Sequence, residues 1–332
     1  MSKFKNYVGI DISKDYFDVA FIQDLKSKSF HNQFENTAMG VKKLMTWLKF
    51  LECGNTDTLL CMEHTGMYSK IIVEKLISEE FQLWVEMSLK IMWSGGVQRG
   101  KNDKIDAERI AVYALKNQDS FSLYQTNRES VTKLRALFSL REKLIGYRTA
   151  LVNVSNEFRK FDSNISKITS CYSKNTLSGI KKDLLKIEKE IDSIIEKDED
   201  LKILFKRITS VPGVGKVTAI LLIYLTNEFK NFDNPRQLAC YSGVVPFEYC
   251  SGKSIKSRSK VHYIANKKLK KALHMCAISA SKNDPEIHQY YIRKTEEGKN
   301  KMLVINNIRN KIVHRICACV REIKLFEARN VA

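Results

Sequence analysis

The sequence has no apolar run long enough to cross a membrane, and its N-terminus lacks the hydrophobic core of a signal peptide. A membrane-spanning helix needs about 20 consecutive apolar residues, whereas residues 1–6 lead directly into a strand-like segment. The chain of 332 residues is nevertheless 44% hydrophobic, which excludes a largely disordered protein. We therefore expect a cytoplasmic protein of two or three folded domains.

The eight cysteines include no pair with the CxxC spacing of a zinc or redox site. Several fall inside apolar runs, where a free cysteine packs as a small hydrophobic residue. We predict reduced thiols and no disulfide framework. His314, Cys317 and Cys319 are close in sequence, but their helical context and the lack of a fourth ligand favour core packing over a metal site.

Acidic residues are scarce, with 37 Asp and Glu against 56 Lys and Arg, which gives a net charge of +19. Such an excess predicts a polyanionic partner, and nucleic acid is the first choice. The scarcity is sharpest between Gly252 and Asn283, where no acidic residue occurs. This basic segment is predicted to bind a phosphate backbone through Lys253, Lys256, Arg258, Lys260, Lys267 and Lys268.

Four serines lie at the start of the basic segment: Ser251, Ser254, Ser257 and Ser259. Neighbouring cations stabilise the charge that develops on a phosphorane, and they help a hydroxyl group to act as a nucleophile. The residues alone do not choose among the four serines. A flexible, solvated loop is the alternative interpretation.

Four of the few acids are placed where a metal site would need them. Asp11 and Glu63 each close an apolar, strand-like run, and Asp103 and Asp106 lie three residues apart at the head of a helical pattern, so they share a helix face. Oxygen-rich clusters of this kind suit Mg²⁺. The alternative for Asp103 is a simple helix N-cap, and we interpret Asp15, Asp18 and Glu108 as surface or support residues.

The distribution of apolar residues predicts three domains: 1–122, 123–205 and 206–332. In the first, strands are expected at 7–12, 16–22, 30–35, 58–63 and 81–86 and helices at about 39–52, 67–79 and 103–116, which indicates a mixed α/β sheet covered by helices. The second domain has two long amphipathic patterns on either side of a Ser/Asn-rich break near 162–178. They predict either an antiparallel helical arm or a coiled-coil dimerisation element.

The third domain is predicted to be mainly helical and opens with the sequence Val-Pro-Gly-Val-Gly at 211–215. This turn is typical of a helix-hairpin-helix motif, in which glycine amides and the next helix N-terminus approach a phosphate. We predict that Gly213, Gly215 and Lys216 contact nucleic acid in this way. An ordinary turn between two helices is the alternative.

In their order along the chain, these motifs resemble the insertion sequence one-ten transposases, also called DEDD transposases, whose relatives include Piv-type DNA invertases. The matching stretches are 9–14, 62–66, 101–107, 140–153, 211–215, 241–246, 251–252 and 298–301. The family pattern is altered at Cys250, which stands where a serine is usual, at Asn102, which replaces threonine, and at Ala265, which replaces glycine.

The resemblance implies a RuvC-like (ribonuclease-H-like) N-terminal domain that holds Mg²⁺ through Asp11, Glu63, Asp103 and Asp106. It also implies a coiled-coil arm and a transposase domain in which Ser251, directly before a glycine, forms a covalent phosphoserine link to DNA. Lys101, beside the third motif, is expected to contact nucleic acid. The implied partners are donor and target DNA, a structured guide RNA from the element's flank, and further copies of the chain in dimers and tetramers, acting at the nucleoid of a bacterium or archaeon.

Two other functions agree with part of the pattern. A RuvC-like junction nuclease that activates water would use the four acids but would give Ser251 no chemical role. A non-catalytic nucleic-acid-binding protein would explain the charge but not the acidic cluster. Metal dependence separates the second alternative from the others, and a covalent protein–DNA adduct separates the transposase from the nuclease.

Overall fold

The computed structural model describes residues 4–63, 66–95, 102–232, 234–247, 250–251, 255–256 and 260–328. They form two compact units, 1–126 and 127–332. None of the described helices is long and apolar enough to cross a membrane.

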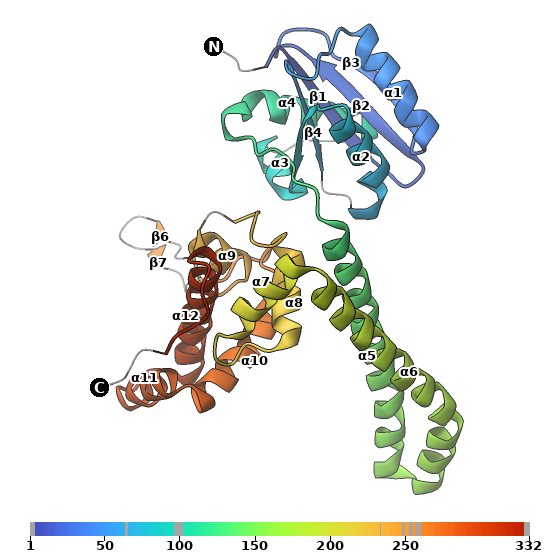
Figure 1. Ribbon diagram of the computed structural model, residues 1–332. Coiled ribbons are helices and arrows are strands. Elements are labelled where there is room, and N and C mark those ends of the chain that lie inside the picture. The colour runs from blue at the N-terminus through green and yellow to red at the C-terminus, as the bar shows by residue number, and fades with distance from the viewer. Residues whose placement is uncertain are drawn as a thin grey trace. The chain divides into compact units, whose positions relative to one another are not determined.

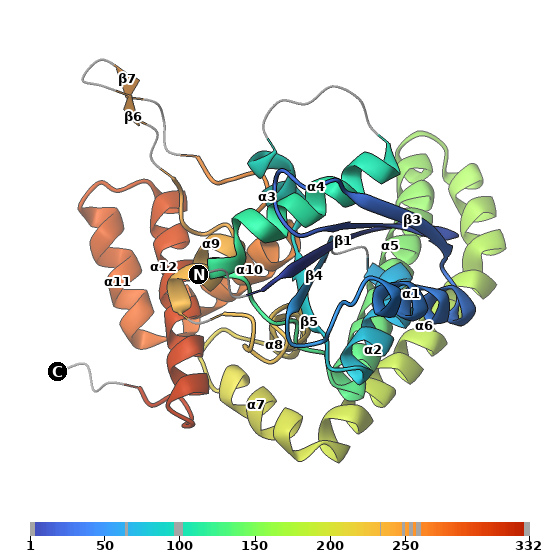
Figure 2. The same ribbon diagram turned by 90° about the horizontal axis from the view of Figure 1, so that it is seen from above.

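The first unit is a five-stranded sheet with helices on both faces (Figures 1 and 2). The strand order is β3-β2-β1-β4-β5, in which β1 pairs antiparallel with β2 and parallel with β4. The strands are β1 (Asn6–Ile12), β2 (Tyr16–Ile22), β3 (Phe30–Glu35), β4 (Thr58–Glu63) and β5 (Gln82–Glu86). The helices are α1 (Ala38–Phe50), α2 (Lys70–Ser78), α3 (Ser88–Ser94) and α4 (Asp103–Lys116), with short 3-10 turns at Gly66–Ser69 and Gln118–Ser120.

Alternate side chains of β1 point to opposite faces of the sheet, and each face is covered by different helices. Val8, Ile10 and Ile12 belong to the core beneath α1 and α2, whereas Tyr7 packs with residues of α4 such as Ile110 on the opposite face. This alternation follows from the two-residue period of a strand. The mixed α/β architecture predicted for this region is confirmed, and α3 is an element that the prediction did not include.

The second unit begins with a hairpin of two long antiparallel helices, α5 (Glu129–Phe161) and α6 (Ser163–Lys197) (Figure 1). The predicted break at 162–178 is wrong, because Asp162 alone separates the helices. Its carboxylate accepts hydrogen bonds from the amides of Asn164 (2.8 Å) and Ile165 (3.2 Å), and this cap starts α6 at once. Most of the polar residues that follow lie on the exposed faces of the hairpin, whereas Ser166 is buried and donates a hydrogen bond to the Ser155 carbonyl (2.9 Å).

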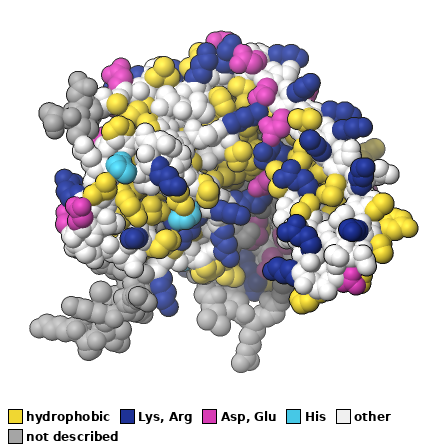
Figure 3. Space-filling model, turned by 90° about the horizontal axis from the view of Figure 1, so that it is seen from below, with side chains coloured by type: hydrophobic (Ala, Val, Ile, Leu, Met, Phe, Trp, Pro, Cys, Tyr) yellow, Lys and Arg dark blue, Asp and Glu magenta, His cyan; other side chains and the backbone are white. Residues whose placement is uncertain are grey.

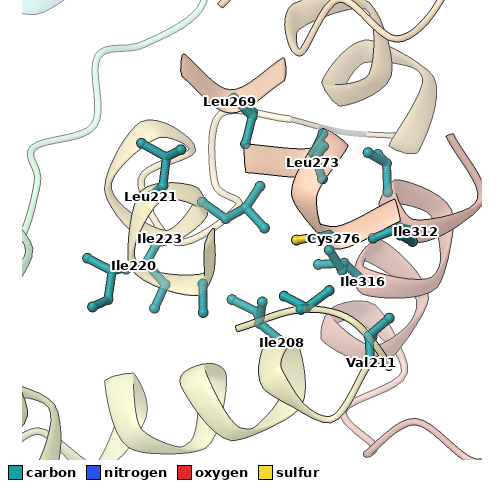
Figure 4. Packing of buried hydrophobic residues seen from close by; sticks show 14 of the residues in the cluster. Ile208, Val211, Ile220, Leu221, Ile223, Leu269, Leu273, Cys276, Ile312 and Ile316 are labelled. Atoms are coloured by element: carbon teal, nitrogen blue, oxygen red, sulfur yellow. The ribbon is translucent and has the colours of Figure 1, made fainter. Parts of the chain in front are cut away.

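The rest of the second unit is helical around one core (Figure 4). Its elements are α7 (Glu199–Thr209), α8 (Lys216–Leu225), α9 (Pro235–Tyr241), α10 (Lys267–Asn283), α11 (Pro285–Glu296) and α12 (Lys301–Arg321), with the short strands β6 (Cys250–Ser251) and β7 (Ile255–Lys256). Figure 4 shows Ile208, Leu273 and Ile316 meeting there from three separate helices. Val131, Leu134 and Phe138 join this core from α5, so the base of the hairpin is part of the globule.

The cysteines whose side chains the structure describes are free, and Cys317 and Cys319 are buried in the core of the second unit.

Candidate active site

Helix α4 lies against β1 so closely that only glycine fits at the contact. A Cβ atom on Gly9 would come within 2.1 Å of the Ala107 carbonyl oxygen and 2.3 Å of the Ala111 amide nitrogen. Gly9 precedes Asp11 by two residues, so both face the same side of the sheet. The small residues on both elements therefore place the first turn of α4 beside the carboxyl end of β1.

The first turn of α4 presents two carboxylates because a different residue caps the helix. The side chain of Asn102 accepts a hydrogen bond from the Lys104 amide at 3.1 Å, which satisfies one of the free amides of the helix terminus. The Asp103 carboxylate is therefore not the N-cap, and the alternative interpretation of this residue is wrong.

Three of the four predicted acids come together. Ligand oxygens of Asp11, Asp103 and Asp106 all lie within 4.8 Å of one another. Burial of Asp11, followed by the negative charges of Glu63, Asp106 and Asp103, raises the pKa of Asp11 to about 6. An all-oxygen donor set with repelling charges fits a hard divalent cation, which would relieve the repulsion that now favours the protonated acid.

Glu63 is not within this mutual distance. It lies at the carboxyl end of β4, the parallel neighbour of β1, and its charge has a larger effect on the pKa of Asp11 than that of Asp106 or Asp103. Asp106 also pairs with Arg109, whose Nη1 lies 2.6 Å from its carboxylate oxygen. The structure therefore groups the carboxylates of Asp11, Asp103 and Asp106, and it places Glu63 at the end of the adjacent strand.

Two further acids border this site. Asp18 lies directly across from Asp11 on β2, is 4% exposed, and contacts His31 Nε2 (2.7 Å) and Gln33 Nε2 (2.9 Å) through its two oxygens. Asp18 is therefore buried and supports the site; it is not a surface residue. Its position in the middle of an apolar strand is the sequence feature that indicates this burial. Glu86, which the sequence interpretation missed, is also buried and accepts a hydrogen bond from Tyr113 Oη at 3.3 Å.

The segment with the predicted nucleophile is a small hairpin. Ser251 lies in β6, paired with Ile255 of β7, and the hairpin's base is closed by mutual backbone hydrogen bonds between Phe247 and Lys260 (2.9 and 3.1 Å). Lys101, Lys253 and Arg258 lie outside the described residues, as do the side chains of Ser251 and Lys256.

The remaining predicted cations of the basic segment are exposed. Lys260 follows the hairpin, and Lys267 and Lys268 begin α10. Lys268 also pairs with Glu142 of α5 at 2.7 Å. Figure 3 shows Lys and Arg side chains spread widely over the face it presents, in keeping with the net charge of +19.

The turn between α7 and α8 contains two glycines, of which one is tightly packed and the other is not. Gly213 has φ +85°, and a Cβ atom there would come within 2.5 Å of the Cys276 carbonyl oxygen in α10. Gly215, by contrast, has open space around its Cβ position. Lys216 binds Glu188 (3.0 Å) and Asp192 (2.7 Å) of α6. Gly213 thus packs against α10, and Lys216 forms ion pairs with α6, both within the second unit.

Comparison with known proteins adds two family matches. The DEDD transposase domain model of the IS110 family, described as "Transposase", matches residues 8–158, and a model described as "Transposase IS116/IS110/IS902 family" matches residues 205–292. Pilin gene-inverting proteins of Moraxella lacunata and Moraxella bovis are each 28% identical over 331 residues, 98% of either chain. The transposase for insertion sequence element IS1111A of Coxiella burnetii is 26% identical over 178 residues, covering 47% of this chain and 48% of the relative.

Proposed function

The chain belongs to the IS110 family of transposases, and we propose that it cuts and rejoins DNA through a covalent link to Ser251. Its acidic cluster would hold Mg²⁺, and an element-encoded RNA would guide it to its DNA sites. The observation that carries the proposal is the meeting of Asp11, Asp103 and Asp106 at the carboxyl end of β1.

The sheet supports a RuvC-like assignment for the first unit. Helices cover both faces of the sheet, and the acids lie at the carboxyl ends of the parallel neighbours β1 and β4. After β1 the chain continues to β2 on one side of this pair, and after β4 it continues to β5 on the other side. In open α/β sheets, ligands bind outside the carboxyl ends of strands at such a point. Glu63 completes the proposed tetrad from the second strand.

Bound Mg²⁺ would neutralise phosphate charge and lower the pKa of the attacking hydroxyl. The carboxylates of Asp11, Asp103 and Asp106 would hold the cation. The Ser251 hydroxyl attacks phosphorus, forming a serine–phosphate ester while the bond to the leaving DNA oxygen breaks. The serine gives up its proton, and the leaving oxygen takes one up. A hydroxyl of the second DNA strand then displaces Ser251 by the reverse exchange, so no phosphodiester is lost.

The exposed cations Lys260, Lys267 and Lys268 would hold the DNA backbone, and base pairing with the guide RNA would supply sequence choice, as in other RNA-guided systems. The pilin gene-inverting relatives support DNA as the substrate. The helical arm is proposed to join copies of the chain into dimers and tetramers.

The test mixes purified protein with element-end DNA, RNA transcribed from the flanking sequence, and Mg²⁺. Wild type and the control Ser254→Ala should form a protein–DNA adduct that resists denaturant, and Ser251→Ala should form none. Asp11→Asn should abolish the adduct as well. Cleavage that persists in Ser251→Ala without any adduct would instead establish a hydrolytic nuclease.

A further inference from the structure

Three aromatic rings cluster at the base of the hairpin that carries Ser251. His262 and Tyr263 stack with ring centroids 4.6 Å apart and planes inclined by 28°, and Phe247 meets His262 edge-on at 6.2 Å. Phe247 is 49% exposed and Tyr263 66% exposed. We call these three residues the stacking surface. It presents aromatic area to solvent close to the predicted nucleophile in the chain.

Backbone hydrogen bonds hold the segments that carry the stacking surface. The backbone of Phe247 is fixed by its two hydrogen bonds with the backbone of Lys260. The ring of His262 is oriented by a hydrogen bond from the Ile264 amide to Nδ1 (3.3 Å), and its carbonyl accepts from the Ala265 amide (3.1 Å). A ring that is already oriented, as that of His262 is, loses little conformational freedom when a ligand binds beside it.

Phe247 and Tyr263 are exposed and lie outside the core of the second unit, against which the nearby Tyr241 and Val245 pack. The exposed ammonium groups of Lys260 and Lys267 flank the surface in sequence, and the chain has no acidic residue from Gly252 to Asn283. Exposed aromatic faces beside cations are the combination that binds single-stranded nucleic acid.

We propose that the stacking surface binds an unpaired nucleobase, with the adjoining phosphates held by Lys260 and Lys267. This inference rests on the proposed function, because strand exchange at Ser251 requires base pairs beside the cut to open. An opened base loses its stacking partners at a cost of a few kcal/mol, and an aromatic side chain replaces them. The base comes either from the exchanged DNA strand or from the guide RNA.

The experiment measures binding of short single strands that carry one fluorescent 2-aminopurine, made as DNA and as RNA, and of the matching duplexes. All proteins carry Ser251→Ala and are assayed without Mg²⁺, so the measurement does not depend on cleavage. Tyr263→Leu and Phe247→Leu are compared with Tyr263→Phe, which keeps the ring, and with Tyr172→Leu, a control on α6 where the tyrosine is 86% exposed.

Tyr263→Leu should weaken single-strand binding about tenfold, within the range of one stacked base, and should remove the quenching of 2-aminopurine. Tyr263→Phe and Tyr172→Leu should bind as the parent does, and duplex binding should be unchanged. A loss confined to DNA assigns the base to the exchanged strand, and a loss confined to RNA assigns it to the guide. Equal loss for single strands and duplex, or no loss in Tyr263→Leu, would overturn the inference even if Ser251 proves to be the nucleophile.

Discussion

Replacing Asp11 by asparagine is expected to stabilise the metal-free protein at neutral pH. Burial and three neighbouring carboxylates, with a smaller effect from Asp18, raise the pKa of Asp11 from its ordinary value of 3.8 to about 6. At about 1.4 kcal/mol per pKa unit, the shift corresponds to about 3 kcal/mol. Because Asp11 is only partly buried, solvent screening reduces the expected effect to about 1–2 kcal/mol.

The sign of the effect follows from proton binding. Below about pH 4 the carboxyl is protonated in both the folded and the unfolded states, and it adds no difference. Between about pH 4 and pH 6 the unfolded chain releases its proton first, so ionisation increasingly favours unfolding. Asp11→Asn removes this penalty, and it should raise the free energy of unfolding at about pH 7.5 but hardly at about pH 4.

Urea denaturation at the two pH values measures the difference, with Asp15→Asn as the control because that residue is exposed on the loop after β1. Mg²⁺ should reverse the order of stability, since a cation that binds only the folded wild type stabilises it. A destabilising Asp11→Asn at neutral pH, or an equal gain at both pH values, would refute the electrostatic reasoning.

Three further predictions concern the elements that hold the sites. Gly9→Val should cost more than the about 1–3 kcal/mol usual for overpacking, because the clash is with the backbone at Ala107, and thermal melting should show it. Gly213→Ala should lower the melting temperature, whereas Gly215→Ala should fold normally and test the helix-hairpin-helix contact through its DNA affinity alone. Arg128→Met should cost about 2–4 kcal/mol in urea titration, because the largely buried carboxylate of Glu228, on the loop after α8, loses its guanidinium partner and keeps the longer contact with Lys230 (3.3 Å); an unchanged midpoint would show that solvent screens the pair.

Strands β1, β2 and β4 were predictable because their apolar runs are short and end at charged or turn residues. The strand predictions at 16–22, 30–35 and 58–63 agree with β2, β3 and β4, and the helix at 103–116 agrees with α4. Asp11 and Asp103 could be assigned to one site because each stands at the end of such an element.

Other features depend on tertiary contacts that local patterns do not record. Asn227, Glu228 and Phe229 all adopt positive φ, a strained run in which Glu228 binds Arg128, 100 residues earlier in the sequence. Lys216 was predicted to face nucleic acid from its place at a helix N-terminus, but its ammonium group binds two carboxylates of α6.

Identification of the DNA-linked residue by mass spectrometry tests the central claim most directly. The adduct formed with element-end DNA, guide RNA and Mg²⁺ would be digested, and the nucleotide-bearing peptide would be sequenced. We predict a phosphodiester remnant on Ser251 alone. A remnant on Ser254, Ser257 or Ser259, or efficient cleavage with no modified peptide, would contradict the proposed mechanism.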